Sequence, residues 1–455
     1  MTRLHTLLLT ATALLAASVL TLNGQSVRQD EFPTSRRQHF GVYNLYDADA
    51  PKVETKVPAG YKAVGISHYG RHGSRYYAGE RGSFLEVYLL LEKAAADSAL
   101  NPRGLQVWEA YRSLYPALKG RESELSQLGR AQHRGIARRM YSQYKNLFGS
   151  NAVKTAWSTT VPRCIESMGA FCEELARCDR RIEVVQDASV RYVSQVSSMQ
   201  DFYYFYKKYD SRKAREMERA YAKANLDTLA FGRQIFRDSS YQVGKLLTLE
   251  QGLWTAYLSL PSSDCWGSPE CQALCEAIEG KDGSAPLYED TMWEQLSRIA
   301  RRIHLIETCE PLLHHSTINI FLVDAMLSLA DSDLQSGKPF VRLRFGHDTI
   351  LETILKDMGI RGWRNLGDSE ANLKEWCTSR IPMASNLQMV FYRKKGAPVL
   401  FKLMLNESEL ELPIPAVTGR LYDWEAFKAY MAPRIEKGKA EALPYLDGNP
   451  YPIPY

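Results

Sequence analysis

Three segments of this chain share one pattern, in which a short apolar strand is followed by a polar turn and then by a helical stretch. The strands are expected at 62–67, 155–158 and 340–345, and the helices near 84–96, 164–175 and 349–358. Repeated strand–turn–helix units predict an α/β fold with a largely parallel sheet. We therefore expect a mostly parallel central sheet flanked by helices, with the three turns at the carboxyl ends of the strands, where such sheets bind ligands.

Two further strands are predicted at 387–393 and 398–405, joined by a short glycine-containing turn as an antiparallel hairpin at a sheet edge. Residues 181–329 differ, because they carry long helical patterns and few strand signals. We expect 181–329 to form an all-helical lobe, inserted between the second and third units and roofing the active site. The α/β core is then discontinuous and consists of residues 25–180 and 330–455.

The N-terminus has the pattern of a targeting segment. Arg3 gives a positive start, and an uncharged apolar stretch follows from Leu7 to Leu22. Because a membrane-spanning helix needs about 20 residues, this shorter stretch favours a cleaved signal peptide over residues 1–24. A retained N-terminal anchor is the alternative. We expect an exported protein, secreted or periplasmic, with no stable membrane insertion after cleavage.

The charge balance argues against one class of partner. The net charge of +5 falls to +4 without residues 1–24, because Arg3 is the one charged residue among them. So mild a charge requires no nucleic-acid partner. One basic run, from Lys207 to Lys223, follows the aromatic residues 202–206. It is either a solvated helix face or a surface that binds extra phosphate groups.

The eight cysteines permit disulfides in an exported protein. Cys265, Cys271 and Cys275 are close enough in sequence to form a local staple, although spacing alone does not decide the pairing. A zinc site is disfavoured, because the chain has no Cys-x-x-Cys pair and no histidine lies near these cysteines in sequence.

The turns after the three predicted strands carry complementary chemistry. Their charged and imidazole side chains are Arg71, His72 and Arg75, then Arg163, and finally His347 and Asp348. Phosphoryl transfer needs cations on the phosphate oxygens, a nucleophile in line and a proton for the departing oxygen. The flanking guanidiniums favour the neutral form of His72, which suits a nucleophile. We find no Asp/His cluster for a two-metal site, and we expect neither a metal nor another cofactor.

The same residues carry a family resemblance. The string from Arg71 to Arg75 resembles the Arg-His-Gly-x-Arg-x-Pro signature of the histidine acid phosphatases, the branch of the histidine phosphatase superfamily that includes phytases and multiple inositol polyphosphate phosphatases. Residues 346–349 are similar to the His-Asp motif near the C-terminus of that family. Segments 125–129 and 157–167 resemble its intermediate segments, and the motifs stand in the family's order.

The resemblance implies a role for each candidate residue. His72 would be the nucleophile that forms a phosphohistidine, and Asp348 would protonate the leaving oxygen before water hydrolyses the intermediate. The phosphate would be held by Arg71, Arg75, Arg163 and His347. Two departures from the family pattern stand out. Tyr77 replaces the usual proline, which puts the stiffness of the loop in doubt. The His-Asp pair is typical of acid phosphatases and phytases, whereas the inositol polyphosphate enzymes usually carry His-Ala-Glu.

The resemblance and the basic run favour a highly phosphorylated small molecule as the substrate, with inositol phosphates such as phytate first. A broad-specificity acid phosphatase or sugar phosphatase is the alternative within the enzyme class. A protein that binds phosphate esters without catalysis belongs to a different class, and the presence of both histidines and Asp348 argues against it. Of the remaining histidines, we expect His133 to pack in the interior and His68 to have a supporting role or none.

Overall fold

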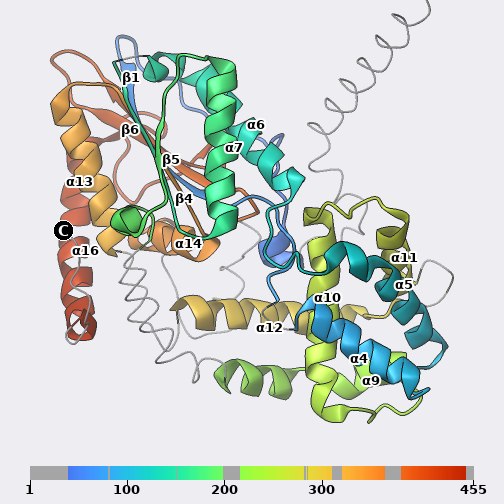
Figure 1. Ribbon diagram of the computed structural model, residues 1–455. Coiled ribbons are helices and arrows are strands. Elements are labelled where there is room, and N and C mark those ends of the chain that lie inside the picture. Colours follow the sequence, from blue (N-terminus) through green and yellow to red (C-terminus); the bar gives the residue numbers. More distant parts are fainter. Residues whose placement is uncertain are drawn as a thin grey trace, which may run out of the picture.

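The computed structural model describes residues 39–79, 82–149, 151–197, 216–280, 283, 285–309, 320–363 and 381–446. The predicted signal peptide, residues 1–24, and most of the basic run that ends at Lys223 lie outside the described residues. The described part forms a sheet with helices on both faces and a group of helices beside it (Figure 1).

The sheet is mostly parallel in its centre, as predicted. Its strands are β1 (Lys62–Arg71), β2 (Val153–Ser158), β3 (Val185–Asp187), β4 (Phe340–Gly346), β5 (Asn386–Arg393), β6 (Leu400–Leu405), β7 (Ser408–Glu409) and β8 (Tyr422–Asp423). The order across the sheet is β3-β2-β4-β1-β5-β6-β7, and β8 pairs with β6. The neighbours from β3 to β1 are parallel, whereas β5 runs antiparallel to β1 and to β6.

The predicted hairpin forms as β5 and β6, but it does not lie at a sheet edge. β5 pairs with β1 from the Lys62–Arg393 pair to the Gly70–Asn386 pair, and β6 is bordered by β7 and β8. Every residue of β5 except Arg393 is buried. A strand that is buried on both faces needs strand neighbours at both edges and helices over both faces, which agrees with its interior position.

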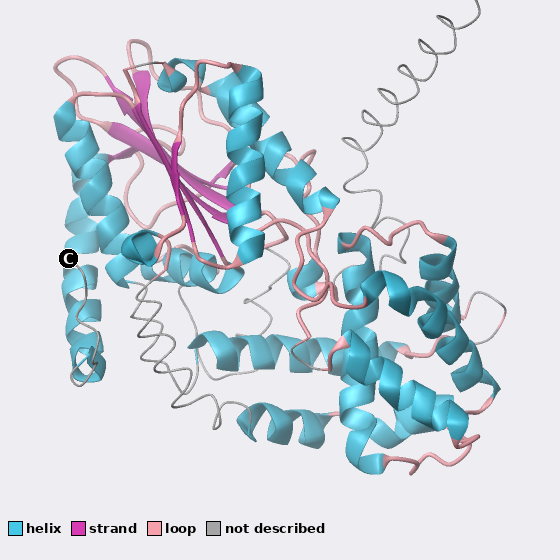
Figure 2. Cartoon of the chain, in the orientation of Figure 1, coloured by secondary structure: helices cyan, strands magenta, loops and turns pink. Residues whose placement is uncertain are grey.

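Helices cover both faces of the sheet (Figure 2). They are α6 (Gln127–Gln143), α7 (Pro162–Cys178), α13 (Ile320–Ser336), α14 (Asp348–Asp357) and α16 (Trp424–Leu446). Alternate residues of β4 show how the faces divide, because side chains alternate along a strand. Val341, Leu343 and Phe345 pack in one core with α6 and α7, whereas Phe340 packs in the other with α13, α14 and α16.

The helical group has a third core of its own. Its helices are α4 (Phe84–Ala96), α5 (Pro102–Leu118), α9 (Thr228–Ile235), α10 (Leu246–Ser259), α11 (Pro269–Glu279) and α12 (Asp290–Cys309). The side chains of Ser83, Asn101 and Ser268 cap the first turns of α4, α5 and α11 by accepting backbone N–H groups. α10 is buried along most of its length and forms the centre of this core.

The packing differs from the predicted domain boundaries. The helix expected near 84–96 forms as α4, but its apolar face packs against α10 and not against the sheet, and α5 packs against α9 and α11. α13 begins inside the predicted lobe 181–329, yet it packs on the sheet. The predicted ranges 25–180 and 330–455 therefore mark the core only approximately. Local hydrophobic patterns reveal an apolar helix face but not its partner.

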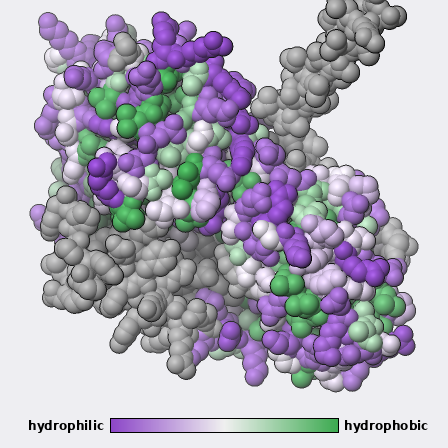
Figure 3. Space-filling model, viewed as in Figure 1, coloured by the Kyte–Doolittle hydropathy of each residue, from purple (hydrophilic) through white to green (hydrophobic). Residues whose placement is uncertain are grey.

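Apolar side chains are dispersed on the face of the molecule that Figure 3 draws, where they lie among hydrophilic ones over both bodies. No helix within the described ranges is both long and apolar enough to cross a bilayer.

Candidate active site

The first predicted turn begins where β1 ends, four residues later than expected, at Arg71. The backbone N–H of Arg71 donates to Ser385 O (2.7 Å), and that of His72 donates to Gly346 O (2.9 Å). Arg71 also stands in register with Gly346 of the parallel strand β4. The first and third predicted turns therefore lie side by side at the carboxyl edge of the sheet.

Two helices hold the next residues of this turn. The N–H of Gly73 donates to Ser167 Oγ of α7 (3.1 Å), and the N–H of Ser74 donates to Gln132 Oε1 of α6 (2.9 Å). A Cβ on Gly73 would lie 2.5 Å from Gly129 O, so the close approach of α6 requires glycine here. The segments that carry the family resemblance therefore meet in space.

His72 is buried, and one of its ring nitrogens is committed. Nδ1 lies 2.9 Å from Gly73 O, and since a carbonyl only accepts, Nδ1 carries the proton. Nε2 then holds the lone pair. Burial, followed by the charges of Arg163, Arg71 and Arg75, lowers the pKa of His72 well below its ordinary value. Both effects favour the neutral imidazole, the form that is able to act as a nucleophile.

Arg71 joins the first turn to the third. Its fully buried guanidinium donates from Nη1 to Ile381 O (2.6 Å), and Nη2 forms an ion pair with Asp348 Oδ2 (2.8 Å). Asp348 is the first residue of α14, where the helix dipole favours a negative charge. Its Oδ1 accepts the N–H of Thr349 (3.0 Å). The carboxyl group is thus held in place while its side chain keeps partial contact with solvent.

Arg75 and Arg163 reach the same place from different elements. Arg75 is buried, donates from Nη1 to Tyr76 O (2.9 Å) and lies over the ring of Tyr43, 5.6 Å from its centroid. Arg163 follows Pro162, the first residue of α7, so it stands in the first turn of a helix. Backbone N–H groups and the dipole at such a terminus attract anions.

His347 completes the group. Its ring centroid lies 5.7 Å from that of His72, and the two planes are inclined by 71°. Burial, followed by the charge of Arg163, lowers the pKa of His347 to about 3, and Asp348 opposes this shift. The structure thus brings together all the candidate residues, namely Arg71, His72, Arg75, Arg163, His347 and Asp348. Cationic and imidazole groups dominate the cluster, which suits a bound phosphate.

A metal site is not evident in the described part of the chain, where no group of three or more His, Cys, Asp or Glu side chains is arranged to hold an ion. Cys265 is a free thiol that donates to Ala117 O (3.7 Å), so it does not take part in the local disulfide staple that the cysteine spacing allows. His133 packs in the interior, as predicted, with its ring 5.6 Å from that of Phe345. His68 lies against the same phenylalanine.

Packing holds Tyr77, the residue that stands where the Arg-His-Gly-x-Arg-x-Pro signature has proline. Tyr77 is fully buried in the core of the helical group, with its ring edge-on to that of Phe84 at 5.8 Å. The neighbouring Tyr76 is also fully buried, and the guanidinium of Arg121 covers its ring at 4.1 Å. The two tyrosines anchor the loop in the helical group by burial, where a proline ring would have stiffened it covalently.

The sequence analysis did not identify several residues that contact the loop or His347. Gln132 and Ser167 hold the loop, and Thr159, Cys164 and Tyr69 surround His347. Ser167, Thr159 and Cys164 lie within segment 157–167, which resembles the family, so the motif could have indicated them. Their contacts could not be predicted from the sequence, because each contact partner belongs to another element.

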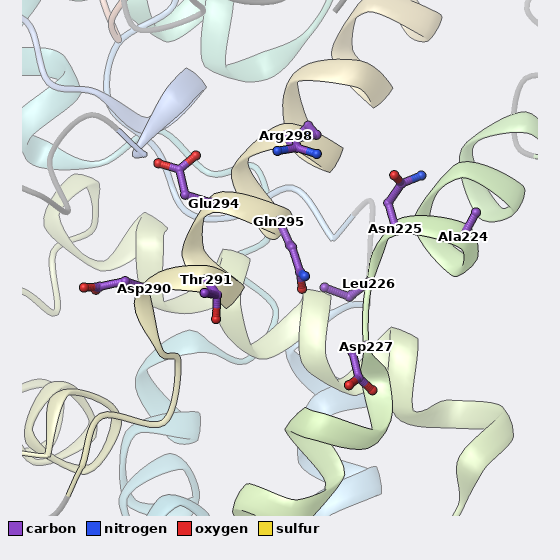
Figure 4. Close-up of a pocket in the computed structure, with 9 residues that line it drawn as sticks. All are labelled: Ala224, Asn225, Leu226, Asp227, Asp290, Thr291, Glu294, Gln295 and Arg298. Atoms are coloured by element: carbon purple, nitrogen blue, oxygen red, sulfur yellow. The ribbon is translucent and has the colours of Figure 1, made fainter.

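A groove on the helical group differs from the candidate site in the charge of its lining (Figure 4). The volume of the groove is about 760 Å³, and its lining consists of Ala224, Asn225, Leu226, Asp227, Asp290, Thr291, Glu294, Gln295 and Arg298. Three of these side chains are acidic and one is basic. Such a lining repels phosphate groups, and none of the candidate residues contributes to it.

Comparisons with known proteins agree with this architecture. No protein-family model matches the sequence, and no curated protein sequence matches it. Among solved structures, Bifidobacterium longum multiple inositol polyphosphate phosphatase in complex with inositol hexasulfate is similar, with a TM-score of 0.69 and 15% identity over 87% of this chain and 97% of that chain. The phosphate complex of the same protein has a TM-score of 0.64 at 15% identity, with the same coverage of both chains. The phytase from D. castellii has a TM-score of 0.59 and 14% identity over 88% of this chain and 85% of that chain. The chain therefore has the fold of these phosphatases.

Proposed function

We propose that this chain is an exported phosphomonoesterase of the histidine acid phosphatase type, which removes phosphate from inositol polyphosphates such as phytate through a phosphohistidine. The observation that carries the proposal is the state of His72. Its Nδ1 lies 2.9 Å from Gly73 O, which assigns the proton to Nδ1 and the lone pair to Nε2, and the charges of Arg163, Arg71 and Arg75 favour the neutral ring. A neutral imidazole among cations is suited to attack a phosphorus atom whose oxygens those cations hold.

In the first step, His72 Nε2 attacks the phosphorus in line with the ester oxygen. A P–N bond forms, the P–O bond to the leaving group breaks, and the departing oxygen takes a proton from Asp348. The imidazole becomes positively charged as the bond forms, and the hydrogen bond from Nδ1 to Gly73 O then strengthens. The phosphoryl oxygens are held by Arg71, Arg75, Arg163 and His347.

In the second step, water attacks the phosphohistidine. Asp348, now a carboxylate, takes a proton from the water, the P–N bond breaks, and orthophosphate leaves with His72 restored. Asp348 must carry a proton in the first step, although its ion pair with Arg71 favours the charged form. A phosphate dianion competes for that guanidinium and repels the carboxylate, so substrate binding itself favours the protonated acid.

The choice of inositol phosphates rests on three supports. The motifs resemble those of phytases. The fold is shared with a multiple inositol polyphosphate phosphatase that binds inositol hexasulfate, and a basic run extends from Lys207 to Lys223. Broad-specificity acid phosphatase or sugar phosphatase activity is the alternative. The proposal of a secreted or periplasmic location rests on the predicted signal peptide.

The test measures orthophosphate release from phytate over time, with and without EDTA, while resolving which lower inositol phosphates appear. We expect release that resists EDTA and requires His72. Release that persists in His72→Ala, or that EDTA abolishes, would refute the mechanism. Faster hydrolysis of simple esters than of phytate at equal concentration would favour the alternative substrate class. Tight phosphate binding without turnover would identify a binding protein instead.

A further inference from the structure

The position of His347 depends first on its backbone. Its N–H donates to the hydroxyl of Tyr69 (3.4 Å), and that hydroxyl donates to Val196 O (2.9 Å). A Cβ at Gly346 would collide with the same hydroxyl, so glycine allows the end of β4 to pass Tyr69 closely. The backbone of His347 is therefore tied to β1 and cannot shift along the sheet edge without breaking these contacts.

The ring of His347 is bounded by two side chains from the second turn. Cys164 Sγ lies 3.8 Å from Nε2 and 4.0 Å from Nδ1, and Thr159 Oγ1 lies 3.5 Å from Nε2. The ring of His72 stands on another side, at 5.7 Å between centroids. Cys164 is fully buried, so this contact leaves no room for water between sulfur and ring.

The thiol of Cys164 is also oriented. It donates to Gly346 O (3.3 Å), the carbonyl that precedes His347. Burial raises the pKa of Cys164 to about 11, so sulfur adds no negative charge beside the anion site. Cys164 follows Arg163 directly in the first turn of α7. One helical turn therefore carries both a candidate phosphate ligand and a contact that orients His347.

We propose that Cys164 and Thr159 are positioning residues that hold the imidazole of His347 in the orientation in which it binds the phosphate. The thiol joins the backbone carbonyl before His347 to the ring of His347, and the threonine hydroxyl limits rotation of that ring. This inference rests on the proposed function, because it assigns His347 to the phosphate.

The test compares Cys164→Ala with Cys172→Ala, a matched control on the same helix. Both cysteines are buried, but Cys172 packs in the core between α6, α7 and the sheet, away from the candidate residues. We measure the Kd of orthophosphate by calorimetry on the full chain, kcat and KM for phytate, and the Tm. Cys164→Ser and Thr159→Val complete the set.

We expect Cys164→Ala to weaken orthophosphate binding about 3- to 10-fold, the effect of losing one modest polar contact. Cys164→Ser should recover part of this loss, Thr159→Val should weaken binding by a similar factor, and Cys172→Ala should lower only the Tm. Equal phosphate affinity in Cys164→Ala and Cys172→Ala would overturn the inference. Orthophosphate binding needs no turnover. Absence of hydrolysis in the unmodified protein would therefore refute the proposed function, whereas the inference about Cys164 would still be tested by the phosphate affinities.

Discussion

The carboxyl edge of the sheet and the groove on the helical group differ in charge and in exposure. The sheet edge gathers guanidiniums that are buried or nearly so, whereas the groove is lined by acids such as Glu294, whose side chain is 55% exposed. Water and salt screen exposed charges, but buried charges act at longer range. We therefore place the proposed active site at the buried cations of the sheet edge and not in the open groove.

The sharpest test of this difference is His72→Ala. Without the nucleophile, phosphate release from phytate should fall by about 10⁴-fold or more, because the covalent route is lost. The matched change in the groove, Glu294→Gln, should leave the rate unchanged. The measurement is kcat/KM for orthophosphate release, with the Tm as the control for folding. Comparable losses in both variants would contradict the assignment of chemistry to the sheet edge.

Acid should destabilise the sheet side of the molecule. Burial lowers the pKa of His68, His133 and His347 to about 3. Between pH 6.5 and pH 3 the unfolded chain binds protons that the folded chain excludes, so stability is complete above pH 6.5 and is lost as the pH falls. From pH 6.5 to 5.5 we expect a loss on the order of 3 kcal/mol in total.

The free energy of unfolding as a function of pH, from urea titrations, checks this expectation. Orthophosphate should oppose the loss, because bound anion favours protonation of His347. A free energy of unfolding that stays constant from pH 7 to pH 5 would contradict the burial of neutral histidines.

Asp348→Asn should separate the acid from the phosphate ligands. We expect about a 10²-fold loss of kcat on phytate, the usual contribution of a general acid. The loss should be much smaller on p-nitrophenyl phosphate, whose leaving group needs little protonation. Equal losses on the two substrates would remove Asp348 from the acid role.

Arg163→Lys should weaken phosphate binding while keeping the positive charge. A lysine ammonium cannot form the bidentate fork, so we expect kcat/KM to fall about 10-fold. Arg298→Lys is the matched control in the groove and should have no effect on the rate. If neither substitution changes kcat/KM, the bidentate geometry of the Arg163 guanidinium does not contribute to phosphate binding.

The smallest effect is expected at Arg344, a fully buried arginine of β4. Its Nη1 donates to Ser67 Oγ (3.0 Å) and its guanidinium lies over Trp157, but no carboxylate within the described ranges pairs with it. Burial lowers the pKa of Arg344 to about 9. Replacing such a charge by a well-packed apolar side chain is often neutral or stabilising. Arg344→Met should therefore change the free energy of unfolding by less than about 1 kcal/mol, measured by urea titration, whereas a large loss would mean that the charge stabilises the fold.

Sequence patterns located the strands and turns because hydrophobic periodicity is local. All the predicted strands form, and the turn residues Arg71, Arg163 and His347 meet because the carboxyl ends of β1, β2 and β4 adjoin. The packing of α4 could not be read in the same way. Its apolar stripe predicts burial, yet nothing within residues 84–96 distinguishes the sheet from α10 as the partner.

The sequence by itself determined the chemical inventory of the site, because the identity and order of Arg71, His72 and Asp348 are properties of the chain. Only the tertiary structure decided how they act. The proton on Nδ1 of His72 follows from its contact with Gly73 O, and the ion pair between the buried Arg71 and the partly exposed Asp348 joins residues from distant segments. The role of Tyr77 also depends on the tertiary structure, because its side chain is buried in the core of the helical group. The physical reason is that protonation, burial and pairing depend on neighbours in space.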